Sequence, residues 1–344
     1  MESLTRLFTT TAPDFNVLWT ASKDLLTSNN PYLNSKIFTG VGYPPNSLLF
    51  YLPLTNFSYL VAQNIFTVLS IVSILVSILL TLKILKIKYN FILFLILFLL
   101  TLLSFPTKFT LGMGQNNFIA LSLILASFYF FKSKKIILSS ILLGLVISLK
   151  TIFIYFLIFF VIKKQWKIVV SSLAIILFSV LIVYLIRGNF DLYTYYLTDV
   201  LPPLFRFEDR EIYYNQGISG FISRIVTDLE LRKNLTMIVS VVLISINAYM
   251  VLVKKNLNLL FSLTTITLLL IDSLAWQHHF VWLLFPFIVL FSYPARLKDK
   301  FIITFAYILI SLNLPNSLLF SNNVFIGTLI LYCLNVKYLK ILLK

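Results

Sequence analysis

Long apolar runs separated by short polar connections dominate the chain from residue 58 onward. A membrane-spanning helix needs roughly 20 apolar residues, and the shortest spans have about 17. The pattern predicts about eleven spans, several of them short. They are expected at 58–82, 90–105, 117–131, 136–149, 151–162, 167–186, 235–253, 257–273, 278–292, 301–314 and 323–339.

The composition places most of the chain in lipid. Apolar residues make up 59% and charged residues 12% of the 344 residues, and the mean hydropathy is +0.95. A soluble domain of this length would carry about twice that charge. The sequence therefore predicts an all-α integral membrane protein, a polytopic helical bundle with amphipathic helices in its outer loops.

Two segments are polar enough to lie outside this bundle. Residues 1–57 are expected to form an outer loop, and residues 58–344 the membrane domain, which includes a second outer loop at 187–234. The first loop either crosses the membrane unassisted or follows a further helix. Short segments around Lys150 and Pro315 predict broken helices, which a membrane tolerates only where they line a protein cavity.

Positive charge alternates between successive connections. One face holds seventeen basic residues and a single acid, Asp299, while the other holds eleven basic and eleven acidic residues. The whole net charge of +16 therefore belongs to one face. Lysine-rich loops stay in the cytosol, so we expect a multi-pass protein of the plasma or inner membrane with no nucleic-acid partner. The basic face holds Lys83, Lys86, Lys88, Lys132, Lys134, Lys135, Lys163, Lys164, Lys167, Lys254, Lys255, Arg296, Lys298, Lys300, Lys337, Lys340 and Lys344.

Cysteine and histidine usage limits metal chemistry. The single Cys333 excludes an intrachain disulfide and a cysteine-based metal site. His278 and His279 are adjacent and no third ligand is evident, so we expect no metal and no cofactor. One of the pair is expected to face a cavity, where it could shuttle a proton or bind an anion. Trp276 and Trp282 fit an interfacial aromatic belt.

The first outer loop and a tight loop expected at 106–116 supply polar candidates. Asp14 opens an amphipathic segment, Asp14–Ser28, which predicts an interfacial helix. Its carboxylate could cap that helix or act in catalysis. Gln115 and Asn116 end the tight loop at a helix start, where Asn116 could be a cap and backbone N–H groups could bind an anion.

Two cations could bind a lipid phosphate. Lys150 lies between two apolar runs, where a lysine costs about 3 kcal/mol, and its ammonium could bind a phosphate or snorkel to headgroups. Arg224 lies on the polar side of an amphipathic helix over 218–229, where it could pair with Asp228 or meet a phosphate. The mixed charge run at 206–211 indicates a solvated face.

All of these candidates fall on the non-cytoplasmic side, although they come from five separate segments. Nucleotide-activated donors are normally absent there, so a transferase would need an activated group delivered by a membrane lipid. One carboxylate as base, cations for a phosphate leaving group and no Asp-x-Asp motif for a metal–nucleotide complex suit such a reaction.

Short motifs follow one another in order over most of the chain. They are Asp14 followed by Asn30-Pro31-Tyr32, Gly42-Tyr43-Pro44-Pro45, Leu111-Gly112-Met113-Gly114-Gln115-Asn116-Asn117, Gly144 followed by Lys150, Asn215-Gln216-Gly217 with Arg224, and Trp276-Gln277-His278-His279. In this order and spacing the chain resembles the polyprenyl-phosphate-mannose-dependent mannosyltransferases of glycosyltransferase family 87, which have the GT-C membrane fold. Members of that family ordinarily carry a helix before the first-loop aspartate, and a proline where this chain has Thr151.

The resemblance implies an inverting transfer of mannose from a polyprenyl-phosphate-linked donor to a lipid or glycan acceptor on the extracytoplasmic face. Asp14 stands where the family has its general base, and His278 or His279 would support the acceptor or the base. We assign the donor phosphate to Lys150, Arg224, Gln115 and Asn116, and further substrate contacts to Tyr43, Asn215 and Gln216.

Two other functions stay open. A flippase or transporter of lipid or polysaccharide would have charges near the bilayer midplane and matching interruptions in its two halves, and the sequence shows no clear sign of either. A glycan ligase would also work outside but usually needs several outer arginines. Arg206, Arg210 and Arg224 keep that alternative open.

Overall fold

The computed structural model describes residues 7–33, 41–293, 296–314 and 320–341. Within these ranges the secondary structure is helical and no β-strand forms. The all-α class predicted from the sequence is therefore confirmed. The positions Glu2, Arg6, Lys36, Pro315 and Lys344, which entered the charge map or the predicted helix breaks, lie outside the described residues.

The chain divides into two compact units, each assembled from segments that are distant in the sequence. Two of the boundaries fall inside helices, namely α3 (Tyr59–Leu85) and α5 (Phe105–Met113). The first unit comprises Met1–Ser77, Thr110–Ile154 and Trp166–Arg206, and the second comprises Ile78–Phe109, Tyr155–Gln165 and Phe207–Lys344.

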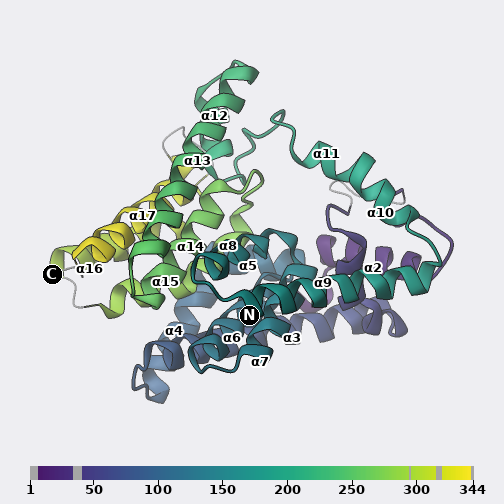
Figure 1. Cartoon of the computed structure of the whole chain (residues 1–344), viewed down its shortest axis with the longest axis horizontal. Coiled ribbons are helices and arrows are strands. Elements are labelled where there is room, and N and C mark those ends of the chain that lie inside the picture. Colours follow the sequence, from purple (N-terminus) through teal and green to yellow (C-terminus); the bar gives the residue numbers. More distant parts are fainter. Residues whose placement is uncertain (1–6, 34–40, 294–295, 315–319, 342–344) are drawn as a thin grey trace. The chain divides into compact units, whose positions relative to one another are not determined.

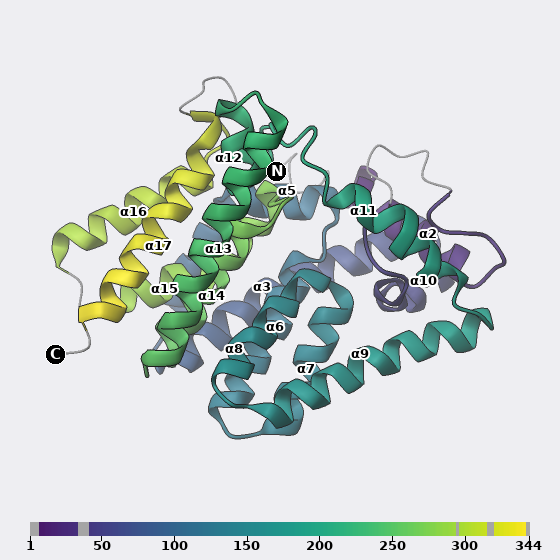
Figure 2. The ribbon, with the colours of Figure 1, turned by 45° about the horizontal axis from the view of Figure 1, so that its top comes forward.

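The first unit contains a layer of three apolar helices, in which α7 lies between α6 and α9 (Figure 2). Ser127 Oγ donates to Ser139 O at 2.8 Å, and Ser172 Oγ donates to Ser140 O at 3.0 Å. Small polar side chains of this kind are typical of helix contacts in membranes. The helices of this unit, besides most of α3, are α2 (Pro13–Leu25), η1 (Pro45–Phe50), η2 (Leu52–Asn56), α6 (Asn117–Lys132), α7 (Ile136–Leu149), η3 (Thr151–Ile154), α9 (Trp166–Arg187), α10 (Asp191–Tyr195), η4 (Tyr196–Val200) and α11 (Leu201–Leu204).

The helix predicted over 14–28 is present as α2. It starts one residue earlier than predicted and ends three residues earlier. Its apolar face packs on η1 and η2, with Phe15 fully buried and its ring centre 6.2 Å from that of Tyr51 and 4.9 Å from that of Phe66. The apolar face of α2 is therefore covered by protein.

The second unit is arranged around α14, which is buried over Leu259–Leu270. Helices α13, α15 and α17 pack against it, and α16 packs on α17 (Figure 1). Asn335 Nδ2 donates to Ser262 Oγ at 2.6 Å, and Asn247 Nδ2 donates to Thr264 Oγ1 at 3.2 Å. The helices of this unit are α4 (Phe91–Leu103), α8 (Tyr155–Ile162), α12 (Ile218–Ile225), α13 (Leu229–Val253), α14 (Leu257–Ile271), η5 (Gln277–Leu283), α15 (Leu284–Ser292), α16 (Leu297–Ser311), η6 (Phe320–Asn322) and α17 (Asn323–Ile341).

A helical segment occupies each position predicted as a span, but most are too short to cross alone. Among the described residues, α3, α9, α13 and α17 are long and apolar enough to span a membrane, and the pair α4–α5, bent by 69°, would make a fifth crossing. The helices α6, α7, α14, η3 with α8, and η5 with α15 are apolar but shorter. The membrane-protein class is supported, and the count of about eleven spans is not confirmed.

Two predicted interruptions have different outcomes. The tight loop expected over 106–116 is wrong, because α5 makes most of it helical and only residues 114–116 separate α5 from α6. The break predicted at Lys150 is confirmed, because its backbone is extended (φ −147°, ψ 97°) between α7 and η3.

Three lysine-rich connections are tight turns. Lys86, Lys134 and Lys164 have left-handed backbone conformations, with φ of 55°, 59° and 55°. The residue after each lysine donates its N–H to a carbonyl five residues back, as in Lys135 N to Phe130 O at 2.9 Å. This is the pattern of a Schellman helix end. The turns leave little chain between neighbouring helices, and the side of the membrane they occupy stays a prediction.

Candidate functional site

Gly114 allows α2 to approach the turn before α6. Its φ is +68°, and a Cβ at this position would lie 2.6 Å from Phe15 Cβ and 2.9 Å from Ala12 Cβ. Any larger residue would therefore push α2 away. With glycine in place, Asp14 lies beside Gln115, whose Nε2 donates a 2.6 Å hydrogen bond to Asp14 Oδ2.

The Asp14 carboxylate is half-buried and holds a proton more readily than an ordinary carboxyl. Burial raises the pKa of Asp14, while the hydrogen bond from Gln115 and the positive charge of Lys150 oppose the rise. The N-cap position of α2 belongs to Ala12, and no side chain caps this helix. The interpretation of Asp14 as a helix cap is therefore wrong, and its environment suits a proton acceptor.

A buried lysine belongs to the same cluster. Lys150 is 4% exposed, and its Nζ donates a short hydrogen bond to Asn117 Oδ1. The ammonium also lies 5.7 Å from the ring centre of Tyr43, whose hydroxyl donates to Gln115 Oε1 at 3.3 Å. A side chain so enclosed by protein does not snorkel to headgroups, so that alternative is wrong. The cluster combines a cation with a carboxylate.

Asn116 stands at the N-cap position of α6, but its side chain makes no capping hydrogen bond. Its Nδ2 donates instead to the Tyr51 hydroxyl at 3.1 Å, and its buried Oδ1 has no hydrogen-bond partner among the described residues. The capping interpretation of Asn116 is wrong. Burial raises the pKa of Tyr51, and the nearby charge of Asp14 adds to that rise, which places Tyr51 in the cluster.

In the second unit, two motifs that are distant in the sequence lie side by side. Gln216 N donates to Ala275 O, and Gln277 N donates to Tyr214 O, each at 2.8 Å. These bonds surround an isolated antiparallel bridge. The Asn-Gln-Gly and Trp-Gln-His-His motifs therefore form one local structure.

His278 and His279 are both buried but have different partners. His279 Nδ1 lies 3.3 Å from Asp272 Oδ2, and its ring stacks on Trp282 with centroids 5.0 Å apart. The ring of His278 stacks instead on Trp276, with centroids 6.3 Å apart. The contact with Asp272 places a carboxylate beside one ring nitrogen of His279. Trp282 is fully buried, so its assignment to an interfacial belt is wrong.

Arg224 ties α12 to neighbouring backbone. Its Nε donates to Asn322 Oδ1 at 2.7 Å, and its Nη1 donates to Ile212 O at 3.1 Å and to Asn215 O at 2.9 Å. Its Nη2 is buried and has no hydrogen-bond partner within the described part of the chain. Burial lowers the pKa of Arg224 to about 10, so the guanidinium stays charged at neutral pH.

The ion pair considered between Arg224 and Asp228 is wrong. Helix α12 ends at Ile225, short of the predicted 218–229. Asp228 is instead the N-cap of α13, and its Oδ1 accepts a 2.7 Å hydrogen bond from Leu231 N.

The side chains of Asn215 and Gln216 are enclosed by protein. Gln216 Nε2 donates to Ser321 O at 2.8 Å, and its Oε1 accepts from Phe325 N at 3.2 Å. Asn215 Nδ2 donates to Ser273 O at 3.2 Å. These bonds hold the loop in place, and the substrate contacts expected of both residues stay predictions.

The structure gathers the candidates into two sets, one in each unit. No group of three side chains suited to a metal lies in the part of the chain that the structure describes. The sequence analysis assigned no role to Tyr51, Asn117 or Asp272. Of these three, only Asp272 stood out in the sequence, as a lone acid shortly before the histidine pair. The first set is Asp14, Tyr43, Gln115, Asn116 and Lys150, and the second is Asn215, Gln216, Arg224, His278 and His279.

Comparison with known families gives the decisive match. The model of glycosyltransferase family 87 matches residues 41–276, more than half of the chain. The chain belongs to glycosyltransferase family 87. It is a membrane glycosyltransferase, and neither a curated protein nor a solved structure matches it.

The region matched to family 87 contains most of the site candidates, from Tyr43 to Arg224. Asp14, His278 and His279 lie outside it. Their roles in this glycosyltransferase therefore depend on their own contacts and on the motif resemblance.

Proposed function

We propose that this family 87 enzyme moves mannose from a polyprenyl-phosphate donor to a hydroxyl of a lipid or glycan acceptor on the extracytoplasmic face of the plasma or inner membrane. The observation that carries the proposal is the cluster of the first unit. There, half-buried Asp14 has a raised pKa, accepts a hydrogen bond from Gln115 and interacts with the charge of Lys150. A base and a cation are the groups that displacement of a phosphate requires.

Asp14 accepts the proton of the acceptor hydroxyl in the proposed step. The acceptor oxygen forms a bond to the anomeric carbon while the bond from that carbon to the phosphate oxygen breaks. Polyprenyl phosphate leaves with the bonding electrons, and attack from the opposite side inverts the configuration. The hydrogen bond from Gln115 orients the carboxylate and favours its ionised form.

Lys150 supplies the positive charge for the leaving phosphate. An ammonium at the edge of two apolar helices is costly, and its positive charge would stabilise a phosphate that leaves there. The contacts with Asn117 and Tyr43 fix where the ammonium lies. Gln115 and Asn116, at the turn before α6, are proposed to donate to the same phosphate.

The second unit contributes its own set of groups. His279, oriented by Asp272, is proposed to bind the acceptor or to assist the base, and His278 to line the same region. Arg224 would contact donor phosphate through Nη2, the one guanidinium nitrogen without a partner among the described residues. Asn215 and Gln216 are proposed to contact the substrate, a role that Tyr43 is proposed to have in the first unit.

A lipid-linked donor follows from the expected sidedness. The lysine-rich turns, including those at Lys86, Lys134 and Lys164, are expected in the cytosol. That orientation leaves the candidate residues on the face where nucleotide-activated donors are normally absent.

The experiment is a donor screen with the purified enzyme in proteoliposomes. Radiolabelled polyprenyl-phosphate-mannose, polyprenyl-phosphate-glucose and a nucleotide-linked mannose are supplied with a mixture of lipid acceptors. We expect transfer from the mannosyl lipid alone, lost in Asp14→Asn. Transfer from the nucleotide sugar would overturn the donor class, and preference for the glucosyl lipid would overturn the assignment of mannose.

A further inference from the structure

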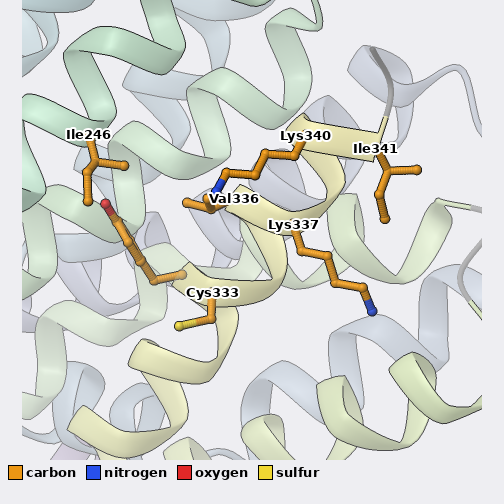
Figure 3. A pocket seen from close by; sticks show the side chains of 7 residues that line it. Ile246, Cys333, Val336, Lys337, Lys340 and Ile341 are labelled. Atoms are coloured by element: carbon orange, nitrogen blue, oxygen red, sulfur yellow. The ribbon is translucent and has the colours of Figure 1, made fainter. Parts of the chain in front are cut away.

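A groove runs along the second unit between α13 and α17, and none of the candidate site residues lines it. Its volume is about 390 Å³ (Figure 3). A second hollow of similar volume shares part of its lining and extends it along α13 as far as Met250. The lining residues on which the argument depends are Ile246, Tyr332, Val336, Lys337 and Lys340.

The groove opens on a surface that faces lipid. Side chains of α13 near it are apolar and largely exposed, including Val242, Tyr249 and Leu252 at 49%, 61% and 67%. On a helix of spanning length, such a surface is covered by acyl chains. The groove therefore opens where acyl chains are expected to lie.

One positive charge of the groove is available to an anion. Lys337 is already paired, because its Nζ lies 2.8 Å from Asp299 Oδ1 and 2.9 Å from Asp299 Oδ2. Lys340 extends along the groove towards Val336, whereas Lys337 extends away from it (Figure 3). No acidic residue is among those that line the groove.

Tyr332 is an independent sign of a bound molecule. The residue is 5% exposed and belongs to the groove wall, yet its hydroxyl has no hydrogen-bond partner among the described residues. A buried hydroxyl without a partner costs free energy. An acceptor oxygen on a lipid in the groove would satisfy it.

We propose that the groove binds one anionic glycerophospholipid of the phosphatidylglycerol class. One acyl chain lies between α13 and α17, the phosphate lies at the Lys340 ammonium, and an ester oxygen accepts from the Tyr332 hydroxyl. Val336 is one helical turn from Tyr332, roughly 6 Å along the axis, which is comparable to the separation of phosphate and ester groups in one lipid. The site is distinct from the proposed donor site and does not depend on the identity of the sugar.

The test compares lipid retention by native mass spectrometry. The full-length protein is purified in detergent and titrated with phosphatidylglycerol or phosphatidylcholine of the same acyl chains. We expect wild type to retain phosphatidylglycerol preferentially and Lys340→Gln to bind it about fivefold more weakly, since one lysine near an anionic lipid surface contributes that much. Ile246→Trp, which fills the groove, should reduce retention of both lipids.

Matched variants make the outcome decisive. Lys298→Gln removes an exposed lysine of α16 that lies outside the groove and should bind as wild type, while Lys340→Arg should retain the preference. Monodispersity in size exclusion confirms that each variant folds. Equal binding by Lys340→Gln and wild type would overturn the proposal. Displacement of phosphatidylglycerol by inorganic phosphate alone, or by polyprenyl phosphate at lower concentration, would also overturn the assignment to a glycerophospholipid.

Discussion

Gln115 Nε2 donates a 2.6 Å hydrogen bond to Asp14 Oδ2 across 101 residues of sequence. The same glutamine accepts from the Tyr43 hydroxyl at 3.3 Å. Three separate motifs of the chain therefore meet at Gln115. Asp14 is oriented by the turn before α6, and its own helix takes no cap from it.

Replacing Asp14 tests the base assignment directly. Asp14→Asn keeps the size of the side chain and its ability to accept from Gln115, but it cannot take a proton. We expect transfer from polyprenyl-phosphate-mannose to fall by about 100-fold or more, measured as labelled product in proteoliposomes containing equal amounts of protein. Asp191→Asn, at an exposed carboxylate of α10, should retain activity. Full turnover by Asp14→Asn would remove Asp14 from the mechanism.

The hydrogen bond from Gln115 should set the acid limb of the pH profile. Burial raises the pKa of Asp14, and Gln115 lowers it. A base must be ionised, so kcat/KM falls as pH drops through that pKa. Gln115→Leu removes the opposing effect and should move the acid limb to higher pH. Tyr43→Phe, which removes the hydrogen bond to Gln115 Oε1, should move it less, and an unchanged profile in Gln115→Leu would contradict the assignment.

Lys150 should affect donor binding more than acceptor binding. Lys150→Met keeps the length of the aliphatic side chain but removes the charge, so we expect the donor KM to rise at least about tenfold while the acceptor KM stays near that of wild type. Steady-state kinetics with each substrate varied in turn measures both. Lys88→Met, at an exposed lysine, is the control. An unchanged donor KM in a variant of normal thermal stability would exclude Lys150 from the phosphate site.

The apolar pattern predicts where the helices lie because lipid demands runs of apolar residues, whatever their tertiary contacts. It does not predict how they end. Residues 106–116 contain polar residues and glycine that are typical of a loop, yet Ser104 and Thr107 hydrogen-bond at 2.9 Å where α5 begins. The sharp bend at Ser104 separates α4, which lies in the expected span, from α5, which occupies most of the expected loop.

The candidate residues could be chosen from the sequence, but their partners could not. A carboxylate, a buried lysine and a histidine pair stand out in an apolar chain because each is costly there. The contact of Asp14 with Gln115 depends on the close approach at Gly114. The contact of His279 with Asp272 depends on the turn between α14 and η5. The spacing of apolar residues carries no information about either contact.

The two histidines should respond differently to substitution. His279 has a carboxylate partner, so His279→Ala should reduce kcat/KM by about 100-fold or more, whereas His278→Phe, which preserves stacking on Trp276, should have a small effect. Asp272→Asn should impair activity, as His279→Ala does. Combining the two changes should add little, because both act through one interaction. Equal and mild effects at both histidines would indicate a packing role.

Arg224 makes hydrogen bonds that give it a structural role beside the predicted phosphate contact. Its guanidinium joins α12 to Asn322 and to the carbonyls of Ile212 and Asn215. Arg224→Lys keeps the charge but cannot make this set of bonds, so we expect the free energy of unfolding to fall by about 1–3 kcal/mol, measured as a lower thermal midpoint in detergent.

Asn322→Ala separates the two roles of Arg224. It removes the acceptor of the Nε bond but keeps the guanidinium, so it should lower stability and leave the donor KM unchanged. If Arg224 also contacts phosphate through Nη2, Arg224→Lys should raise the donor KM beyond the value in Asn322→Ala at a temperature where both variants are folded. Equal donor KM values in the two variants would leave Arg224 with the structural role alone, and the charge that meets the phosphate would then come from Lys150.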